Sequence, residues 1–303
     1  MPVALLVGQA PSAMARDLDI DFSSENGQVT AALAALGFAV VPNPYSSLLS
    51  VESTRKSDIR FRNGQLGGGR RLQSDRPLYF EGYVAFQNYA PEYSSVDGAS
   101  DDSADVRWTS FSSTLGVGWE FPLLEGLVLR PTLDVALGRI TSSADVSDDN
   151  EDVTDYIAGD GMYAGGYGGA LTLDYKYRAV DKEIDLILRT TAMRLVPLGD
   201  FSDVDVSANV ATTAGVARLR RPIRGWSQFG GPVRSVYEAS YAAYTGDQGE
   251  VLDIPWLARV GVGLEFETGH LARYAPSRTR VMFRVVSGDN GFTALTFGAG
   301  ISF

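Results

Sequence analysis

The sequence predicts an all-β fold, a transmembrane up-and-down antiparallel β-barrel of about twelve strands with a short helix near the N-terminus. Apolar and polar residues alternate with a period of two through most of the chain, up to its last residue, Phe303. The alternating segments are about ten to sixteen residues long, whereas strands of soluble sandwiches usually have about five or six. The polar face mixes small residues with charges of both signs, where an exposed soluble strand would carry Lys, Glu and Thr.

Composition restricts the class of protein further. Of 303 residues, 45% are hydrophobic, and no stretch of eighteen uninterrupted apolar residues exists, which excludes a helical membrane protein. A barrel stays compatible, because only every second residue of its strands faces lipid. The net charge of −11 argues against nucleic acid as a partner, since phosphate binding needs a basic surface. The absence of cysteine fits passage through an oxidising periplasm.

The first fifteen residues resemble the remnant of a secretory signal. Residues 3–7 form a short apolar core, and Ala13-Met14-Ala15 fits the small-x-small cleavage pattern. A basic segment before the core is missing, so a flexible and mildly apolar N-terminus is the alternative. We expect a signal-peptide remnant over 1–15 and a mature chain that begins at Arg16.

The segment 16–44 contains the helix candidate. Residues 28–41 are rich in Ala and Leu, and Gly37 and Pro42 would stop a helix there. The segment is more apolar than a helix in a polar lumen should be. We therefore expect a helix that lies in the lumen or against the rim, with an extra strand as the alternative.

The barrel itself is expected over 45–303. In the segment 126–140, Leu133 and Val135 fall on one face, and Thr132 and Asp134 fall on the other. The strongest strand patterns cover 78–90, 106–121, 126–140, 162–177, 182–195, 254–267, 278–287 and 292–303. Weaker candidates cover 45–54, 58–72, 204–219 and 233–245.

The predicted connections differ at the two ends of the barrel. Segments 91–105 and 141–161 are long and acidic and contain no Lys or Arg, whereas 122–125 and 178–181 are short. Segment 218–232 is read as a basic connection at the short end. Long outer loops and short periplasmic turns are typical of an outer-membrane barrel.

The C-terminal strand, together with the number and residue pattern of the other strands, resembles a known family. The last strand alternates its apolar residues up to an aromatic terminus, as the signal read by the outer-membrane assembly machinery does, at Leu295, Phe297, Ile301 and Phe303. The strand count resembles the translocator domain of autotransporters, and segments 65–69, 78–83 and 115–121 are similar to solitary autotransporter-like barrels.

This resemblance implies residence in the outer membrane of a Gram-negative bacterium after export through the periplasm. It implies a monomer whose partners are outer-membrane lipid, lipopolysaccharide and the assembly machinery. Autotransporters carry a passenger ahead of the barrel. Only about thirty residues separate the expected cleavage site from the first strand here, so we expect a solitary barrel without a large passenger.

Charged residues on the polar face form the most informative set, called here the charge lattice. Two roles are open, a cross-strand salt-bridge network that stiffens the wall and the lining of a hydrophilic channel. We favour the network, and the two roles can coexist. The charge lattice comprises Glu81, Glu120, Arg130, Asp134, Asp174, Lys176, Asp185, Arg189, Glu238, Arg259, Glu265, Arg280 and Arg284.

Catalytic and metal sites are not expected. His270 is the single histidine and falls in a predicted periplasmic turn with only Glu265 and Glu267 nearby, so a solvated turn residue is the simpler interpretation. The acidic run 147–152 has oxygen ligands suited to Ca²⁺ but lacks the glycine and distal glutamate of an EF-hand. We predict no cofactor and no enzyme activity. A structural or transport role is expected, with a small-solute channel and an outer-membrane hydrolase as the alternatives.

The alternation of lipid-facing and lumen-facing residues in the last strand gives a first testable prediction. Ile301→Asp places a charge on the lipid face, at a cost of roughly 1–4 kcal/mol depending on depth. Ser302→Asp, one residue later, faces the lumen, where water or Arg280 and Arg284 can reach it. Outer-membrane levels of the two variants should therefore differ, with Ile301→Asp the more damaging. Equal damage, or greater damage from Ser302→Asp, would mean that the two faces are assigned wrongly.

Overall fold

The computed structural model describes residues 25–44, 60–72, 76–90, 105–145, 161–199, 206–251, 255–269, 277–289 and 293–302. Several predicted features lie outside these ranges. They are the signal remnant 1–15, the strand candidate 45–54, the acidic run 147–152, His270 and Phe303.

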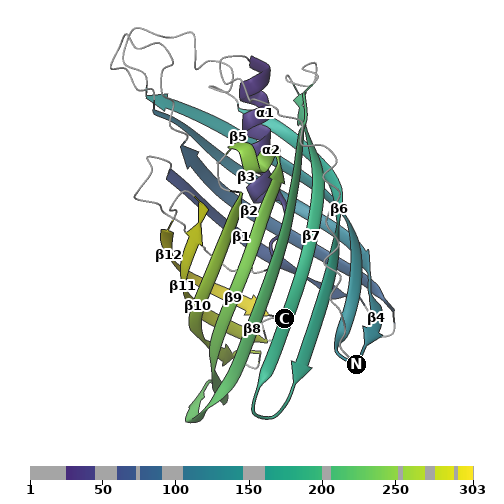
Figure 1. Ribbon diagram of the computed structural model, residues 1–303, viewed down its shortest axis with the longest axis vertical. Coiled ribbons are helices and arrows are strands. Elements are labelled where there is room, and N and C mark those ends of the chain that lie inside the picture. The colour runs from purple at the N-terminus through teal and green to yellow at the C-terminus, as the bar shows by residue number, and fades with distance from the viewer. Residues whose placement is uncertain are drawn as a thin grey trace.

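A single antiparallel sheet contains all the strands of the described residues, and strands that are consecutive in sequence are neighbours in it, except that the short β4 pairs only with β5 and β3 pairs with β5. Figure 1 shows this sheet curled strongly around its own concave side. The strands are β1 Arg60–Arg71, β2 Leu78–Ala90, β3 Asp105–Trp119, β4 Phe121–Leu124, β5 Leu127–Asp145, β6 Met162–Arg178, β7 Glu183–Leu198, β8 Ala208–Gln228, β9 Gly231–Gly246, β10 Trp256–Glu267, β11 Arg278–Gly288 and β12 Thr293–Ser302. The predicted up-and-down antiparallel fold is confirmed.

Two predicted strand boundaries need correction. The segment 106–121 was expected to be one strand, but it breaks at Glu120 into β3 and the short β4, which pairs only with β5. The segment 218–232 was expected to be a basic connection, but β8 continues through it to Gln228. Phe229 and Gly230 then form a two-residue turn to β9, and both have positive φ, as tight hairpin turns require.

The faces of the sheet are inverted relative to a soluble protein. On β5, Leu133 is 72% exposed and Leu137 65% exposed on the convex side, whereas Thr132 and Asp134 are buried on the concave side. The same alternation holds on the other long strands, where large apolar side chains point outward. The prediction that the apolar face looks outward and the polar face looks inward is therefore confirmed. We call the concave side the lumen.

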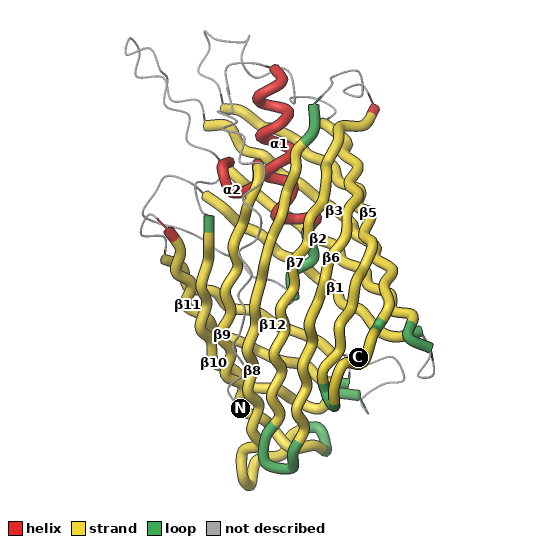
Figure 2. The backbone as a smooth tube through the Cα atoms, turned by 45° about the vertical axis from the view of Figure 1, so that its right-hand side comes forward, coloured by secondary structure: helices red, strands yellow, loops and turns green. Residues whose placement is uncertain are grey.

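The two ends of the sheet differ as predicted. One end, called here the short-turn end, carries the turns after β4, β6 and β8, and Gly126 supplies the positive φ of the first. The other end, called the long-loop end, carries the connections after β2, β5 and β7. Figure 2 shows both helices at the long-loop end and the turns gathered at the opposite end.

Two helices accompany the sheet, α1 Glu25–Val40 and α2 Asp247–Val251. The predicted helix is present, and it lies in the lumen rather than at the rim. From Ala31 onward its side chains are apolar on all sides, and most residues from Val29 to Val40 are buried, as expected for a helix enclosed in the lumen. Within the described residues, neither helix has the length and hydropathy needed to cross a bilayer.

Close packing of α1 against the wall predicts the effect of a glycine replacement. A Cβ at Gly138 on β5 would lie 2.8 Å from the Leu36 side chain of α1. Gly138→Leu should therefore lower the free energy of unfolding by about 1–3 kcal/mol through overpacking. Urea titration of the refolded protein in detergent micelles measures this change.

The matched control is Gly215→Leu on the outer face of β8, where the nearest atoms to an added Cβ are 4.0 Å away. That variant should unfold at the same urea concentration as the wild type. A similar loss of stability in both variants would contradict the tight seating of α1.

Candidate functional site in the barrel lumen

The half of the lumen near the long-loop end is filled by α1. Its apolar side chains pack into one cluster with residues from the surrounding wall, including Ile140, Met162, Leu195 and Val210. All four wall residues lie close to the long-loop ends of their strands. Figure 1 shows the helix enclosed by the sheet at this end. The apolar helix therefore meets an apolar section of an otherwise polar lumen.

Polar wall residues hold the last turn of α1. Helix C-termini leave backbone carbonyls without intrahelical partners. Here Thr114 Oγ1 donates to Val40 O at 2.7 Å, and Gln87 Nε2 donates to Ala35 O, one turn earlier, at 2.9 Å. Gln65 Nε2 donates to the carbonyls of Ala39 and Val41 at 3.1 and 3.0 Å. Side chains of β1, β2 and β3 thus fix the helix in one position.

The short helix α2 closes the space beside α1. Asp247 accepts a hydrogen bond from the backbone N–H of Asn209 at 2.7 Å, and burial raises the pKa of its carboxyl group. Gln248 is fully buried and accepts from Thr212 Oγ1 at 3.2 Å. Tyr89 of β2 donates to Val251 O at 3.0 Å. The connection after β9 is therefore tied to both sides of the lumen.

Towards the short-turn end, the lumen becomes charged. Arg189 of β7 donates to both oxygens of Glu81 on β2, at 3.0 and 2.6 Å. The same guanidinium contacts Asp134 of β5 at 3.3 Å. All three residues are at most 5% exposed. A bidentate contact of this kind compensates buried charges far better than a single point contact does.

A second group of charges follows at the end of β3. Glu120 accepts from Arg130 Nε at 2.9 Å and also pairs with Arg71. Arg130 reaches Asp174 at 3.4 Å, and Asp174 pairs with Lys176 at 3.0 Å. Glu120, which lies between β3 and β4, thereby joins β1 to β5, and Arg130 joins β5 to β6.

A third group lies on the opposite part of the wall, over β7 to β11. Glu238 accepts from Arg218 Nε at 2.8 Å and from Arg284 Nε at 2.9 Å. Arg280 Nη1 lies 3.5 Å from Glu265 Oε2. Asp185 pairs with both Arg218 and Arg220. Arginine predominates here, and its planar fork suits such shared contacts.

The structure places twelve of the thirteen charge-lattice residues in buried positions on the lumen side. Lys176 differs, because its side chain is 53% exposed at the short-turn end. Arg259 is buried on the lumen side of β10. The stiffening role assigned to the charge lattice stays a prediction.

Sequence reasoning missed several partners of this set, namely Arg71, Glu183, Arg218, Arg220 and Arg278. Arg218 and Arg220 were placed in a connection, although their spacing continues the alternation of Ala214 and Val216. This alternation of inward and outward residues was the signal that could have placed both arginines on the lumen side of β8. Glu183 joins Arg220 at 2.8 Å and Arg278 at 2.7 Å, a contact between strands that no local pattern reveals.

The predicted assembly-signal residues lie on β12. Leu295 and Phe297 point outward and are 63% and 64% exposed. Ile301 belongs to the same strand, paired with Thr279 of β11, while Phe303 lies outside the described residues. Their recognition by an assembly machinery stays a prediction.

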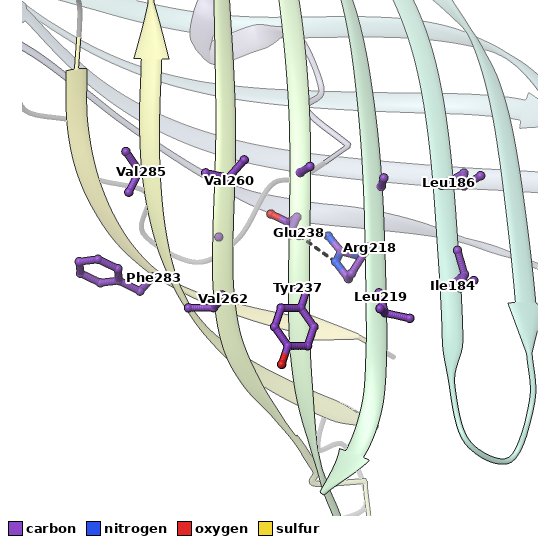
Figure 3. A pocket seen from close by; sticks show the side chains of 13 residues that line it. Ile184, Leu186, Arg218, Leu219, Tyr237, Glu238, Val260, Val262, Phe283 and Val285 are labelled. Carbon is purple, nitrogen blue, oxygen red and sulfur yellow. Dashed lines mark hydrogen bonds and ion pairs between the residues drawn. The ribbon is translucent and has the colours of Figure 1, made fainter.

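The outer face carries an apolar groove of about 520 Å³ over β7 to β11. Figure 3 shows Leu219, Tyr237, Val262 and Phe283 around it, while Arg218 and Glu238 pair with each other beside them. Outward-facing and lumen-facing side chains are thus separated only by the thickness of the sheet. Within the described residues, no three His, Cys, Asp or Glu side chains are grouped as a metal site requires.

Comparisons with known proteins give matches among solved structures alone. No protein-family model matches the chain, and no curated protein matches it. The transport unit of the autotransporter AIDA-I from Escherichia coli superposes with a TM-score of 0.51 at 13% identity, covering 92% of this chain and 98% of that one.

Two further structures are similar. The beta domain of the Bordetella autotransporter BrkA gives a TM-score of 0.48 at 11% identity, covering 85% and 97% of the two chains. The NanC porin gives 0.35 at 11% identity, covering 79% and 99%. From the match to AIDA-I, together with the strand order, the chain has an autotransporter-like β-barrel fold.

The buried ion pairs predict the effect of removing one partner. Arg189→Met leaves Glu81 and Asp134 without their counter-charge, which should lower the free energy of unfolding by about 3–5 kcal/mol. Arg194→Met removes an exposed arginine from the outer face of the same strand and should cost less than about 1 kcal/mol. Urea titrations in detergent micelles compare the stability of the two variants. Equal losses in the free energy of unfolding would show that the buried ion pairs add no more stability than an exposed arginine does.

Proposed function

We propose that the protein is an autotransporter-like barrel of the bacterial outer membrane with a structural or transport role, and that its lumen is plugged at rest. The observation that carries this proposal is α1. It is buried within the lumen, and side chains of three strands hydrogen-bond its C-terminal half. A helix seated in this way blocks passive diffusion through that half of the barrel.

Residence in an outer membrane is supported by the inverted faces of the sheet. Leucine, valine and aromatic side chains are exposed along the convex side, where water would disfavour so continuous an apolar surface. We propose insertion from the periplasm as a monomer, with lipid, lipopolysaccharide and the assembly machinery as partners. The longer connections and the end that holds α1 would then face outside, and the short-turn end would face the periplasm.

A small-solute channel is the second candidate, and one observation favours it. The charged half of the lumen contains a cavity of about 510 Å³ that begins below α1. A continuous channel would require α1 to leave its seat. The two candidates therefore differ in whether α1 moves.

A cross-link tests that difference in a chain that has no natural cysteine. A Cβ at Gly37 would lie 3.1 Å from the Cβ of Val210 on β8, close to the separation of about 3.5–4.5 Å that disulfides use. In planar bilayers, Gly37→Cys/Val210→Cys should show the same low conductance before and after reduction. A large wild-type conductance that the disulfide abolishes would instead establish the channel.

A helix-displacing variant gives the complementary measurement. Leu33→Glu places a carboxylate at a fully buried position of α1, and it should raise the conductance several-fold because the charge cannot be solvated there. Asn26→Glu, at the exposed beginning of the same helix, should leave the conductance unchanged.

Gly37→Cys/Val216→Cys is the control for the cross-link, since Val216 lies six residues further along β8 and out of reach.

A further inference from the structure

Two small side chains hollow the apolar groove on the outer face. Ala217 of β8 and Ala239 of β9 are paired in the sheet, and they lie between Leu186 of β7 and Val260 of β10 in the same register. The two alanines and these larger neighbours all line the groove, whose volume is about 520 Å³. Sites for small molecules usually have about 300–1,000 Å³, so the groove is large enough to hold one ligand.

The end of the groove nearest the short turns is polar. Leu219 and Tyr237, which are paired with each other, line this end. Figure 3 shows the Tyr237 hydroxyl on the side of the C-terminal end of β8. The next outward position of β8 after Leu219 is Arg221, about 7 Å further along the strand. Its side chain is exposed, and its carbonyl oxygen accepts from Ser235 Oγ at 3.3 Å. A phenolic hydroxyl and a cation therefore lie at one end of an apolar groove.

A second cation lies beside Arg221. Glu183 of β7 is paired with Arg220 of β8, which brings the preceding residue, Lys182, opposite Arg221. Lys182 Nζ lies 6.0 Å from the ring centroid of Tyr177, whose side chain is exposed on the outer face. The polar end of the groove therefore has cations on both β8 and the turn that leads into β7.

The outer face offers these two cations no carboxylate. The outward positions of β7 to β11 hold no Asp or Glu. The acids of these strands point into the lumen and pair there with arginines. Within the described residues, Asp181 of the turn before β7 forms no ion pair with Lys182 or Arg221. An anion that reaches this end of the groove therefore meets donors that no carboxylate occupies.

A second copy of this chain would not complete the site. A two-fold contact through this face brings the same outward positions of another barrel against it, and these contain no acid for Arg221 or Lys182. An anionic phospholipid supplies both parts. Its alkyl chain covers the exposed alanines, and its phosphate accepts hydrogen bonds from arginine, lysine and tyrosine together.

We propose that this groove binds one anionic phospholipid, with its phosphate at Arg221 and an alkyl chain over Ala217 and Ala239. The proposal rests on the proposed outer-membrane location, in which the short-turn end lies at the leaflet that faces the periplasm. Phe229 and Phe266, whose ring centroids are 6.1 Å apart, lie at the same end, as aromatic side chains at a membrane interface do. The level of Arg221 is therefore the level of lipid head groups.

Native mass spectrometry of the refolded full chain in detergent tests the site. The protein is incubated with equal amounts of dioleoyl phosphatidylglycerol, an anion, and dioleoyl phosphatidylcholine, which has no net charge. One phosphatidylglycerol should be retained with about tenfold preference, the effect of one charge-assisted contact. Equal retention of the two lipids, or no retention, would overturn the proposal, and so would a dimer that excludes lipid. Heat-modifiable gel migration and conductance test the barrel and its plug separately, so a lack of lipid binding alone counts against this site only.

Removal of the cation tests where the head group lies. Arg221→Gln should weaken the retention of phosphatidylglycerol about tenfold, because one charge-assisted contact is lost. Arg194→Gln is the matched control, since Arg194 is exposed on the outer face of β7 near the long-loop end. Undiminished retention by Arg221→Gln, or an equal loss in both variants, would overturn the head-group site.

A bulky side chain in the groove tests where the alkyl chain lies. Ala239→Phe should weaken the retention of both lipids about tenfold, the cost of exposing about two methylene groups. Ala192→Phe, at an exposed outward position of β7 outside the groove, is the control and should retain lipid as the wild type does. Wild-type retention by a folded Ala239→Phe variant, as judged by heat-modifiable migration, would overturn the groove as the lipid site.

Discussion

In the outer membrane that we propose for this barrel, hydrogen bonding of the backbone within hydrocarbon is the constraint on which the rest of the structure depends. No water is present there to satisfy a free N–H or C=O group, so a chain that crosses hydrocarbon as strands has to pair them along their length. Pairing fixes the direction of each side chain, alternately outward and inward. Outward positions such as Leu133 on β5 are mostly apolar, and most charges of the described strands point inward, with exceptions such as Arg194 on the outer face of β7. The convex and concave faces of one sheet consequently serve two different environments.

Crowding of charge into the lumen creates a second requirement, which is pairing. An isolated buried ion is far more costly than a paired one, and each acid of the wall lies beside an arginine or lysine from another strand. Glu81 and Arg189 show the consequence for topology. They are 108 residues apart in sequence and meet because β2 and β7 face each other across the lumen. The same pairs that neutralise the lumen therefore also connect distant strands.

The lumen divides into two halves with different chemistry. Near the long-loop end, apolar wall residues and α1 exclude water, and polar side chains appear where the helix needs partners for its last carbonyls. Near the short-turn end, arginines and carboxylates line an open cavity. The plug and the cavity can thus serve separate roles within a single barrel.

The sequence by itself determined which residues form strands and which face they present, since alternation is local and needs no knowledge of neighbours. The strand over 78–90 was predicted with its observed bounds, and Glu81 was assigned to its observed face. The alternation was overlooked at Arg218 and Arg220, where a cluster of basic residues looks like a connection although β8 continues. Only the tertiary structure decided that α1 lies within the lumen, because an apolar helix can pack against any apolar surface. It also decided which charges meet, because register and curvature bring together residues that have no relation along the chain.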